Sequence, residues 1–121
     1  MAKKYVFCPV ETTLDVIAGR WKVMIIHYLL QGKKRFNQLQ RELGGISHRT
    51  LARQLREMEV KGIVIREDYG EIPPRVEYSL SPLGVSLRDI LLEMHAWGEK
   101  YGGDVELDAS GDGSGDKSRT K

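Results

Sequence analysis

The segment from Ile46 to Gly62 places its apolar and basic residues with the period of an α-helix. At about 100° per residue, three apolar side chains gather on one side of the predicted helix, namely Leu51, Leu55 and Met58. Three guanidinium groups gather on the opposite side, namely Arg49, Arg53 and Arg56. Ser47 is a good N-cap and Gly62 a good residue to end the helix. One face therefore requires a core and the other is strongly basic.

The basic face has two interpretations. A row of arginines repels itself unless an anion lies opposite, and short polar residues stand at the entrance of the helix: Ser47, His48 and Thr50. Such a helix suits the major groove of DNA. The alternative is a solvated surface helix that happens to be basic, and this helix alone does not decide between the two.

Before this helix the pattern predicts two further helices. Pro9 ends a short extended arm that starts at Tyr5, and residues 11–18 show helical spacing of apolar residues. The mostly apolar segment from Trp21 to Leu30 ends at Gly32, and we expect it to be a buried central helix. His27 within it is expected to be a partly buried core histidine.

A third helix precedes the arginine-bearing one. Residues 33–36 form a short basic connector that could be a minimal strand, and Asn37 is expected to cap a helix that runs to Leu43. Three residues of this segment should turn inward: Phe36, Leu39 and Leu43. The pair Gly44-Gly45 then makes a tight turn, so the sequence predicts a helix-turn-helix.

After Gly62 the period changes to strict alternation. Ile63 and Ile65 are expected on one side of a strand, and three residues on the other: Val64, Arg66 and Asp68. In residues 75–80, one face is shared by Val76, Tyr78 and Leu80. Pro73 and Pro74 suit an exposed tip. A two-stranded hairpin directly after a helix-turn-helix makes a winged helix, an α+β and mostly helical fold.

Ser81 and Pro82 are expected to cap a long helix that reaches about Tyr101. Its large apolar residues follow spacings of four and three, and they form an expected dimer interface: Leu83, Leu87, Ile90, Met94, Trp97 and Tyr101. The alternative is that the helix packs on its own domain. That domain is small, however, and has little core left to cover a helix of this length. Residues 1–101 are thus predicted to be a DNA-binding and dimerisation domain. Residues 102–121, rich in Gly, Ser and Asp, are predicted to be a disordered tail.

The distribution of charge is more informative than its total of +2. Residues 33–66 contain nine basic and three acidic side chains, whereas residues 102–121 contain five acidic and three basic ones. A local basic patch is what releases counterions from a nucleic acid. The sequence starts with no signal peptide and has no apolar run of membrane-spanning length, so we expect a cytoplasmic protein with no membrane partner.

Searches for other chemistry find little. The three histidines and the one cysteine lack metal-ligand spacing, and no phosphate-binding loop or nucleophile motif is present. We therefore expect no enzyme activity, no metal and no cofactor. Cys8 is the one reactive candidate: it precedes a helix start that would favour the thiolate, but its apolar neighbours would equally suit an inert buried thiol.

Three stretches of the chain resemble the HxlR-type winged-helix transcriptional regulators of bacteria. They are CPVETTLDVIAGRWKVMIIHYLLQGKKRFNQL, GISHRTLARQLREMEVKGIVIR and YGEIPPRVEYSLSPLG, and they lie between Cys8 and about Tyr101. The resemblance implies a homodimer that binds a palindromic operator in double-stranded DNA. It also implies that Cys8 could sense oxidants or electrophiles, as the cysteine at this position does in some members. The tail lies outside the family pattern.

We expect the DNA-binding residues to form two groups, one that contacts bases and one that contacts phosphates. Base edges would be read by Arg49, Thr50 and Arg53, with support from Ser47, His48 and Arg56. Phosphates would be held beside the preceding helix by Arg35, Asn37 and Gln38, and from the wing by Arg66 and Arg75. The alternative function is a winged helix that binds an acidic protein partner, and salt-dependent retention on duplex DNA separates the two. The sequence does not indicate which operator or which small-molecule effector the protein binds.

Overall fold

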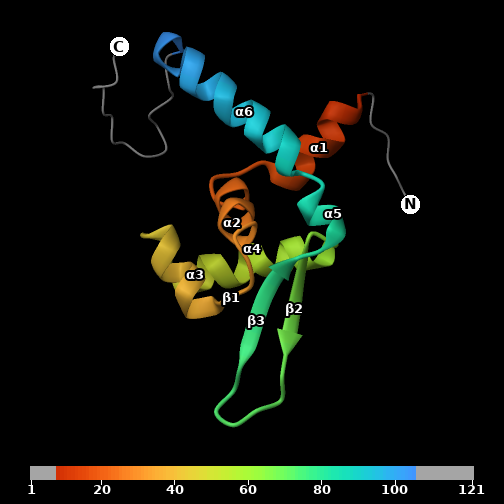
Figure 1. Ribbon diagram of the computed structural model, residues 1–121, viewed down its shortest axis with the longest axis vertical. Helices are drawn as coiled ribbons and strands as arrows, with labels where there is room; N and C mark the ends of the chain where they lie inside the picture. Colours follow the sequence, from red (N-terminus) through yellow and green to blue (C-terminus); the bar gives the residue numbers. More distant parts are fainter. Residues whose placement is uncertain (1–7, 106–121) are drawn as a thin grey trace. The chain divides into compact units, whose positions relative to one another are not determined.

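The structure, a computed structural model, describes residues 8–105 (Figure 1). The chain divides into two compact units, residues 1–87 and 88–121. The first unit contains, in order, α1 (Pro9–Ile17), α2 (Lys22–Leu29), β1 (Lys34–Arg35), α3 (Phe36–Leu43), α4 (His48–Val60), β2 (Val64–Asp68), β3 (Val76–Leu80) and α5 (Pro82–Val85). The second contains α6 (Arg88–Tyr101) and a 3₁₀ turn, η1 (Gly102–Asp104).

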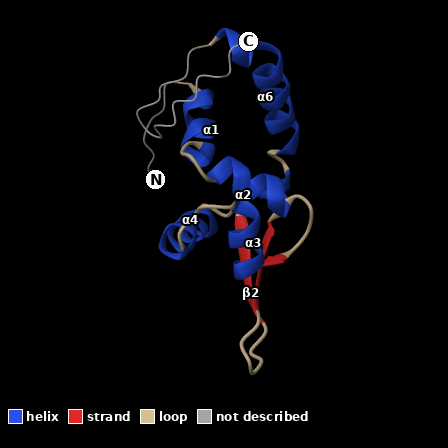
Figure 2. Cartoon of the chain, turned by 90° about the vertical axis from the view of Figure 1, so that its left-hand side faces the viewer, coloured by secondary structure: helices blue, strands red, loops and turns tan. Residues whose placement is uncertain are grey.

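The core of the first unit lies between α2, α3, α4 and the sheet. Six large side chains there are fully buried: Ile25, Ile26, Leu39, Leu51, Leu55 and Met58. α2 was expected to be the buried central helix, and this prediction is confirmed. The β2–β3 hairpin extends away from the helices in both views (Figure 2). The predicted helix-turn-helix with a wing is therefore the observed fold.

Both predicted ends of α4 are confirmed. The Ser47 hydroxyl accepts a hydrogen bond from the Thr50 N–H at 3.0 Å, which makes Ser47 the N-cap. At the other end Gly62 has a φ of 79°, and its N–H donates to the Glu59 carbonyl at 3.0 Å. The Ile63 N–H donates to the Met58 carbonyl at 2.9 Å, which completes a Schellman motif. These bonds fix the start and stop of the arginine-bearing helix.

The short basic connector contains a minimal strand, β1, which pairs with the hairpin and makes a three-stranded sheet. The strand order is β1-β3-β2, and both pairs are antiparallel. Val64 pairs with Leu80 and Arg66 with Tyr78, so the predicted facing sets are correct. Ile63 lies before the strand and is buried, whereas Ile65 lies within it, is exposed and pairs with Ser79. Within β2 itself, Val64 is buried and the other four residues are exposed.

Two predictions about single residues in the helices are wrong. His27 is exposed, because the buried face of α2 follows helical spacing through Lys22, Ile25, Ile26 and Leu29 and leaves His27 on the other side. Asn37 does not cap α3: the helix begins one residue earlier, at Phe36, and Arg35 occupies the cap position with no side-chain hydrogen bond. The backbone of β1 leads directly into the helix there.

The predicted long C-terminal helix is interrupted at Ser86 and Leu87. Ser81 and Pro82 begin a helix as expected, with the Ser81 hydroxyl accepting from the Gly84 N–H at 3.0 Å. The Leu83 carbonyl then accepts from the Ser86 hydroxyl at 2.5 Å and from the Ser86 N–H at 3.2 Å. The Leu87 N–H turns to the Gly84 carbonyl instead. Ser86 thus competes for the carbonyl that an uninterrupted helix would need.

Within α6 the apolar stripe is exposed. Its members retain between 38% and 57% of their accessible surface: Ile90, Met94, Trp97 and Tyr101. The predicted tail starts at residue 102, where η1 follows α6, and residues 106–121 lie outside the described residues. Among the helices that the structure describes, none has the length and apolarity required to cross a membrane.

Candidate nucleic-acid interface

The basic residues between positions 33 and 66 divide sharply by type. All three lysines form ion pairs. Lys33 pairs with Glu67 at 3.2 Å and Lys34 pairs with Glu42 at 3.2 Å. Lys61 pairs with Asp15 of α1. Each ammonium group therefore has a carboxylate of the same chain beside it, which offsets its charge.

The arginines of the same segment behave in the opposite way. All six are exposed, and within residues 8–105 none of them makes a side-chain hydrogen bond or an ion pair. They are Arg35, Arg41, Arg49, Arg53, Arg56 and Arg66. Guanidinium groups present a planar fork that matches phosphates and the edge of guanine. Of these six, Arg41 on α3 is an addition to the residues predicted from the sequence.

The polar residues at the entrance of α4 have defined structural tasks. The Ser47 hydroxyl caps the helix and donates to the Thr50 hydroxyl at 3.0 Å. The His48 ring lies over Phe36 of α3, with 4.5 Å between ring centres, and Phe36 in turn lies 6.4 Å from Tyr78 of β3. These contacts tie the first turn of α4 to α3 and the sheet. The orientation of its arginines follows from this packing.

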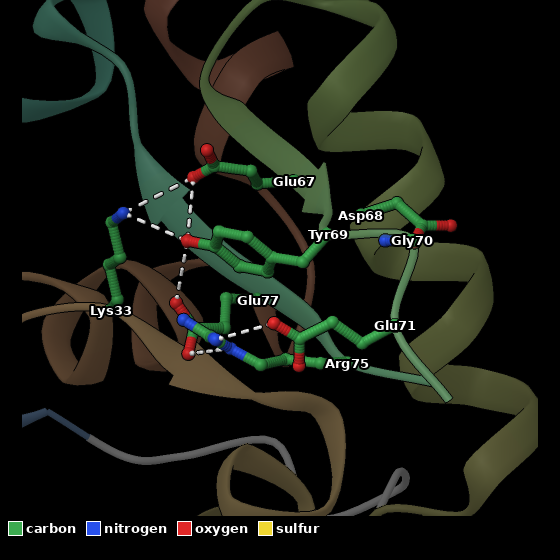
Figure 3. Close-up of polar contacts among 8 residues, drawn as sticks. All are labelled: Lys33, Glu67, Asp68, Tyr69, Gly70, Glu71, Arg75 and Glu77. Carbon is green, nitrogen blue, oxygen red and sulfur yellow. Dashed lines mark hydrogen bonds and ion pairs between the residues drawn. The ribbon is translucent and has the colours of Figure 1, made fainter. Parts of the chain in front are cut away.

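The wing arginine, Arg75, does not lie free as expected for a phosphate contact. Its Nη1 is 3.1 Å from Glu71 and its Nε is 3.4 Å from Glu77 (Figure 3). Its guanidinium also lies over the ring of Tyr69. The guanidinium that was expected to contact DNA is thus already bound by two carboxylates and an aromatic ring. From the wing strands, Arg66 remains as the exposed unpaired cation in the described structure.

Tyr69 is the centre of a wing cluster, whose other members are Lys33, Glu67, Arg75 and Glu77. Its phenolic oxygen accepts from Lys33 at 3.2 Å and lies 3.0 Å from an oxygen of each of Glu67 and Glu77 (Figure 3). Hydrogen bonds to Tyr69 and Glu67 raise the pKa of Lys33, and the hydrogen bond from Lys33 lowers the pKa of Glu67. For Tyr69 itself, the hydrogen bond from Lys33 lowers the pKa, but burial and the two carboxylates outweigh it and raise the pKa. The cluster joins the connector before β1 to the end of β2 and β3 that adjoins the tip loop.

A second tether holds the flank of α4. The Lys22 ammonium of α2 donates to Gln54 at 2.8 Å and to Glu57 at 2.9 Å. This hydrogen bond and the charge of Lys22 lower the pKa of Glu57. Neither Lys22 nor Tyr69 was predicted as a site residue. The signal for Lys22 was available, since it falls on the buried face of α2 one turn before Ile25 and Ile26.

The HxlR-like helix-turn-helix family profile matches residues 16–106, three-quarters of the chain. The chain belongs to the HxlR family of transcriptional regulators. The HTH-type transcriptional regulator YdeP of Bacillus subtilis is 50% identical over 94 residues, which cover 78% of this chain and 73% of YdeP. The redox regulator HypR in its reduced form is 50% identical with a TM-score of 0.74, over 78% of this chain and 93% of HypR. The reduced regulator YodB of B. subtilis is 33% identical with a TM-score of 0.73, over 84% and 100%.

This HxlR-family chain is accordingly a DNA-binding transcriptional regulator and not an enzyme. The remaining predicted site residues are placed as follows. Asn37 is exposed and Gln38 half-buried on α3, beside Arg35 and Arg41. Cys8 is exposed and precedes the first turn of α1, so its thiol is not buried as one of the two interpretations required. No three metal-ligating side chains among the described residues are grouped to hold a metal ion.

Proposed function

We propose that this HxlR-family regulator reads a specific operator with the first two turns of α4. The observation that carries this proposal is the set of six exposed arginines that make no ion pair within residues 8–105, three of which project from α4. Base edges are read by Arg49, Arg53 and Thr50, and phosphates are held by Arg35, Arg41, Arg56 and Arg66. Asn37 and Gln38 add polar contacts from α3. A bidentate arginine–guanine contact contributes about 1–3 kcal/mol of discrimination.

The experiment starts with a duplex selected by the full chain from a randomised library. Affinities of Arg49→Ala, Arg53→Ala and Arg56→Ala are then measured for this duplex and for a scrambled one at several salt concentrations. Arg49→Ala and Arg53→Ala should weaken binding to the selected duplex much more than to the scrambled one. Arg56→Ala should weaken both alike and reduce the salt slope by about one unit. Arg88→Ala on α6, where Arg88 lies beside Asp89, is the matched control.

A proportional loss on both duplexes for Arg49→Ala and Arg53→Ala would make all three arginines phosphate contacts. If the chain selects no duplex from the library, the result would favour the alternative role, in which the arginines bind an acidic protein. Both outcomes contradict base reading by α4. We place this activity in the cytoplasm, where chromosomal DNA is accessible to a bacterial regulator.

The proposed assembly is a homodimer on a palindromic operator. It is supported by the exposed stripe of α6, since an apolar face of this size on a 14-residue helix is unusual for a monomer. Leu83 and Leu87 precede the interruption and extend the same apolar pattern. Two copies would present their α4 helices to successive major grooves, about 34 Å apart.

We also propose that Cys8 makes the regulator responsive to oxidants or electrophiles. The thiol is exposed and occupies the N-cap position of α1, where a reagent in solution can reach it. HypR is a redox regulator of the same family and half identical in sequence. Because this chain has one cysteine, its products are a mixed disulfide, an adduct or a bridge between two subunits.

A further inference from the structure

α4 carries an acidic residue at the position best suited to neutralise one of its arginines. Glu57 follows Arg53 by four residues, so the two side chains share one face one turn apart. Opposite charges at this spacing normally attract each other on a helix surface. In the described structure no ion pair joins them, and Lys22 lowers the pKa of Glu57 more than the charge of Arg53 does.

The reason is that Lys22 binds the Glu57 carboxylate. The Lys22 ammonium lies 2.9 Å from Glu57 Oε1 and 2.8 Å from Gln54 Oε1. The other cation within helical reach of Glu57 is Lys61, again four residues away, and it is taken by Asp15 of α1. α2 thus binds Glu57 of α4, and α1 binds Lys61, the C-cap residue of the same helix. Arg53 is left exposed.

The environment of Lys22 shows why its bond to Glu57 is a fixed feature. The Lys22 side chain is 11% exposed and lies on the face of α2 that also carries Ile25 and Ile26. An ammonium withdrawn from water in this way requires its acceptors, because an unpaired buried charge is strongly unfavourable. Glu57, by contrast, is about half exposed and could turn toward Arg53 if Lys22 were absent.

We propose that Lys22 is a positioning residue that holds Glu57 away from Arg53 and so keeps the Arg53 guanidinium available to DNA. This inference rests on the proposed contact of Arg53 with the operator. Lys22 touches no nucleic acid in this arrangement. Lys22 changes the charge that α4 presents to DNA. The capping residues, by contrast, define where the helix begins and ends.

The test compares four forms of the full chain: native, Lys22→Met, Glu57→Gln and the double variant. Binding to the selected and scrambled duplexes is measured at several salt concentrations, and folding is checked by circular dichroism. Lys22→Met should lower affinity for the selected duplex roughly three- to tenfold, the size expected when one ionic contact is weakened. It should also reduce the salt slope by up to about one unit, because Glu57 then neutralises Arg53. Glu57→Gln alone should change affinity less than Lys22→Met does and in the opposite direction, because the charges of Glu57 and Arg53 already interact.

The decisive form is the double variant. With Glu57→Gln added to Lys22→Met, no carboxylate remains to neutralise Arg53, so affinity and salt slope should return to native values. A merely structural role for Lys22 would leave the double variant as defective as Lys22→Met, and that result would overturn the inference. Lys34→Met is the matched control, since Lys34 is another buried lysine but pairs with Glu42 of α3. It should not respond to Glu57→Gln.

Two further variants keep the result interpretable. Lys22→Gln retains a hydrogen-bonding group in the buried position, and it replaces Lys22→Met if that variant does not fold. Arg53→Ala tests the proposed function itself. If Arg53→Ala leaves binding intact, the contact of Arg53 with DNA is wrong. If Arg53→Ala weakens binding while the Lys22 variants do not, the contact stands and the role of Lys22 is wrong.

Discussion

The guanidinium of Arg75 lies 3.9 Å from the centre of the Tyr69 ring, on the wing. Arg75 lies just before β3 and Tyr69 directly after β2, and the Tyr69 N–H also donates to the Arg75 carbonyl at 3.0 Å. The two residues therefore close the hairpin through backbone and side chain together. Their contact stabilises the wing and makes Arg75 a structural residue.

Arg75→Ala and Arg66→Ala should consequently have different effects. Arg66 is exposed and unpaired in the described structure, so its loss should weaken binding to any duplex and reduce the salt slope by about one unit. Arg75 is already neutralised by Glu71 and Glu77, so its loss should leave the slope within error. Both variants are compared with the native chain by measuring their affinities for a scrambled duplex at several salt concentrations. Equal slope changes in the two variants would show that Arg75 leaves its partners when DNA binds.

The wing cluster should be stable over a defined pH window. The lowered pKa of Glu67 means that its contribution is present above its ordinary pKa near 4.5 and is lost as the pH falls through the lowered value. The raised pKa values of Lys33 and Tyr69 mean that their contribution is present below about pH 10 and is lost as the pH rises through the raised values. Absorbance titration should show one phenol that ionises late, and Tyr69→Phe should remove it. Hydrogen exchange should quicken in β2 and β3 of that variant.

Gly84 is expected to be intolerant of any side chain. A Cβ at this position would lie 2.4 Å from the Ile63 carbonyl oxygen and 3.1 Å from Leu80. Gly84→Ala should therefore lower the free energy of unfolding by about 1–3 kcal/mol, measured by urea denaturation. Gly98→Ala on α6 is the control, since nothing lies within 4 Å of its Cβ position. That change should be neutral or stabilise the helix by up to about 1 kcal/mol.

The proposed dimer can be tested within α6 alone. Met94→Glu together with Trp97→Glu places two charges in the exposed stripe without altering the first unit of the chain. Sedimentation should then show monomers, because burial of these charges in an interface is strongly unfavourable. Glu93→Gln changes a neighbouring exposed polar residue and should leave the dimer intact. A dimer that persists in the double variant places the interface on another surface.

Oxidation should act through Cys8. Diamide removes two electrons and two protons from a pair of thiols, so it should join two subunits through Cys8 or join Cys8 to an added small thiol. We expect a change of at least severalfold in affinity for the selected duplex, reversed by dithiothreitol. Cys8→Ser should bind this duplex normally and should not respond. The same response in both proteins would remove Cys8 from any sensing role.

The sequence predicted best those features that a few adjacent residues determine. Ser47 and Gly62 act through hydrogen bonds to residues within four or five positions, and both ends of α4 were predicted correctly. The interruption at Ser86 was missed because an unbroken 3-4 spacing of apolar residues continues through it. Spacing reports which side chains share a face, but it does not report competition for a backbone carbonyl.

The pairing of charges depended on contacts between distant positions. Arg75 and Arg66 are both wing arginines in the sequence, yet one is neutralised and the other is free. The difference arises because Arg75 lies beside Glu77 and opposite Tyr69, in a register that only the folded hairpin defines. Lys22 likewise meets Glu57 across 35 positions. Charge counts along the chain could identify the basic segment but could not identify which of its members remain available.

The division between paired lysines and unpaired arginines also has a consequence for the conditions under which this regulator works. A guanidinium keeps its proton at every pH that a cell experiences, whereas ammonium groups, thiols and imidazoles titrate closer to that range. Because the cations exposed on α3, α4 and β2 are arginines, the positive potential that DNA encounters should be the same in acidified and alkaline cytoplasm. The charge that this surface presents to DNA is thus carried by guanidinium groups, which do not titrate within the cellular pH range.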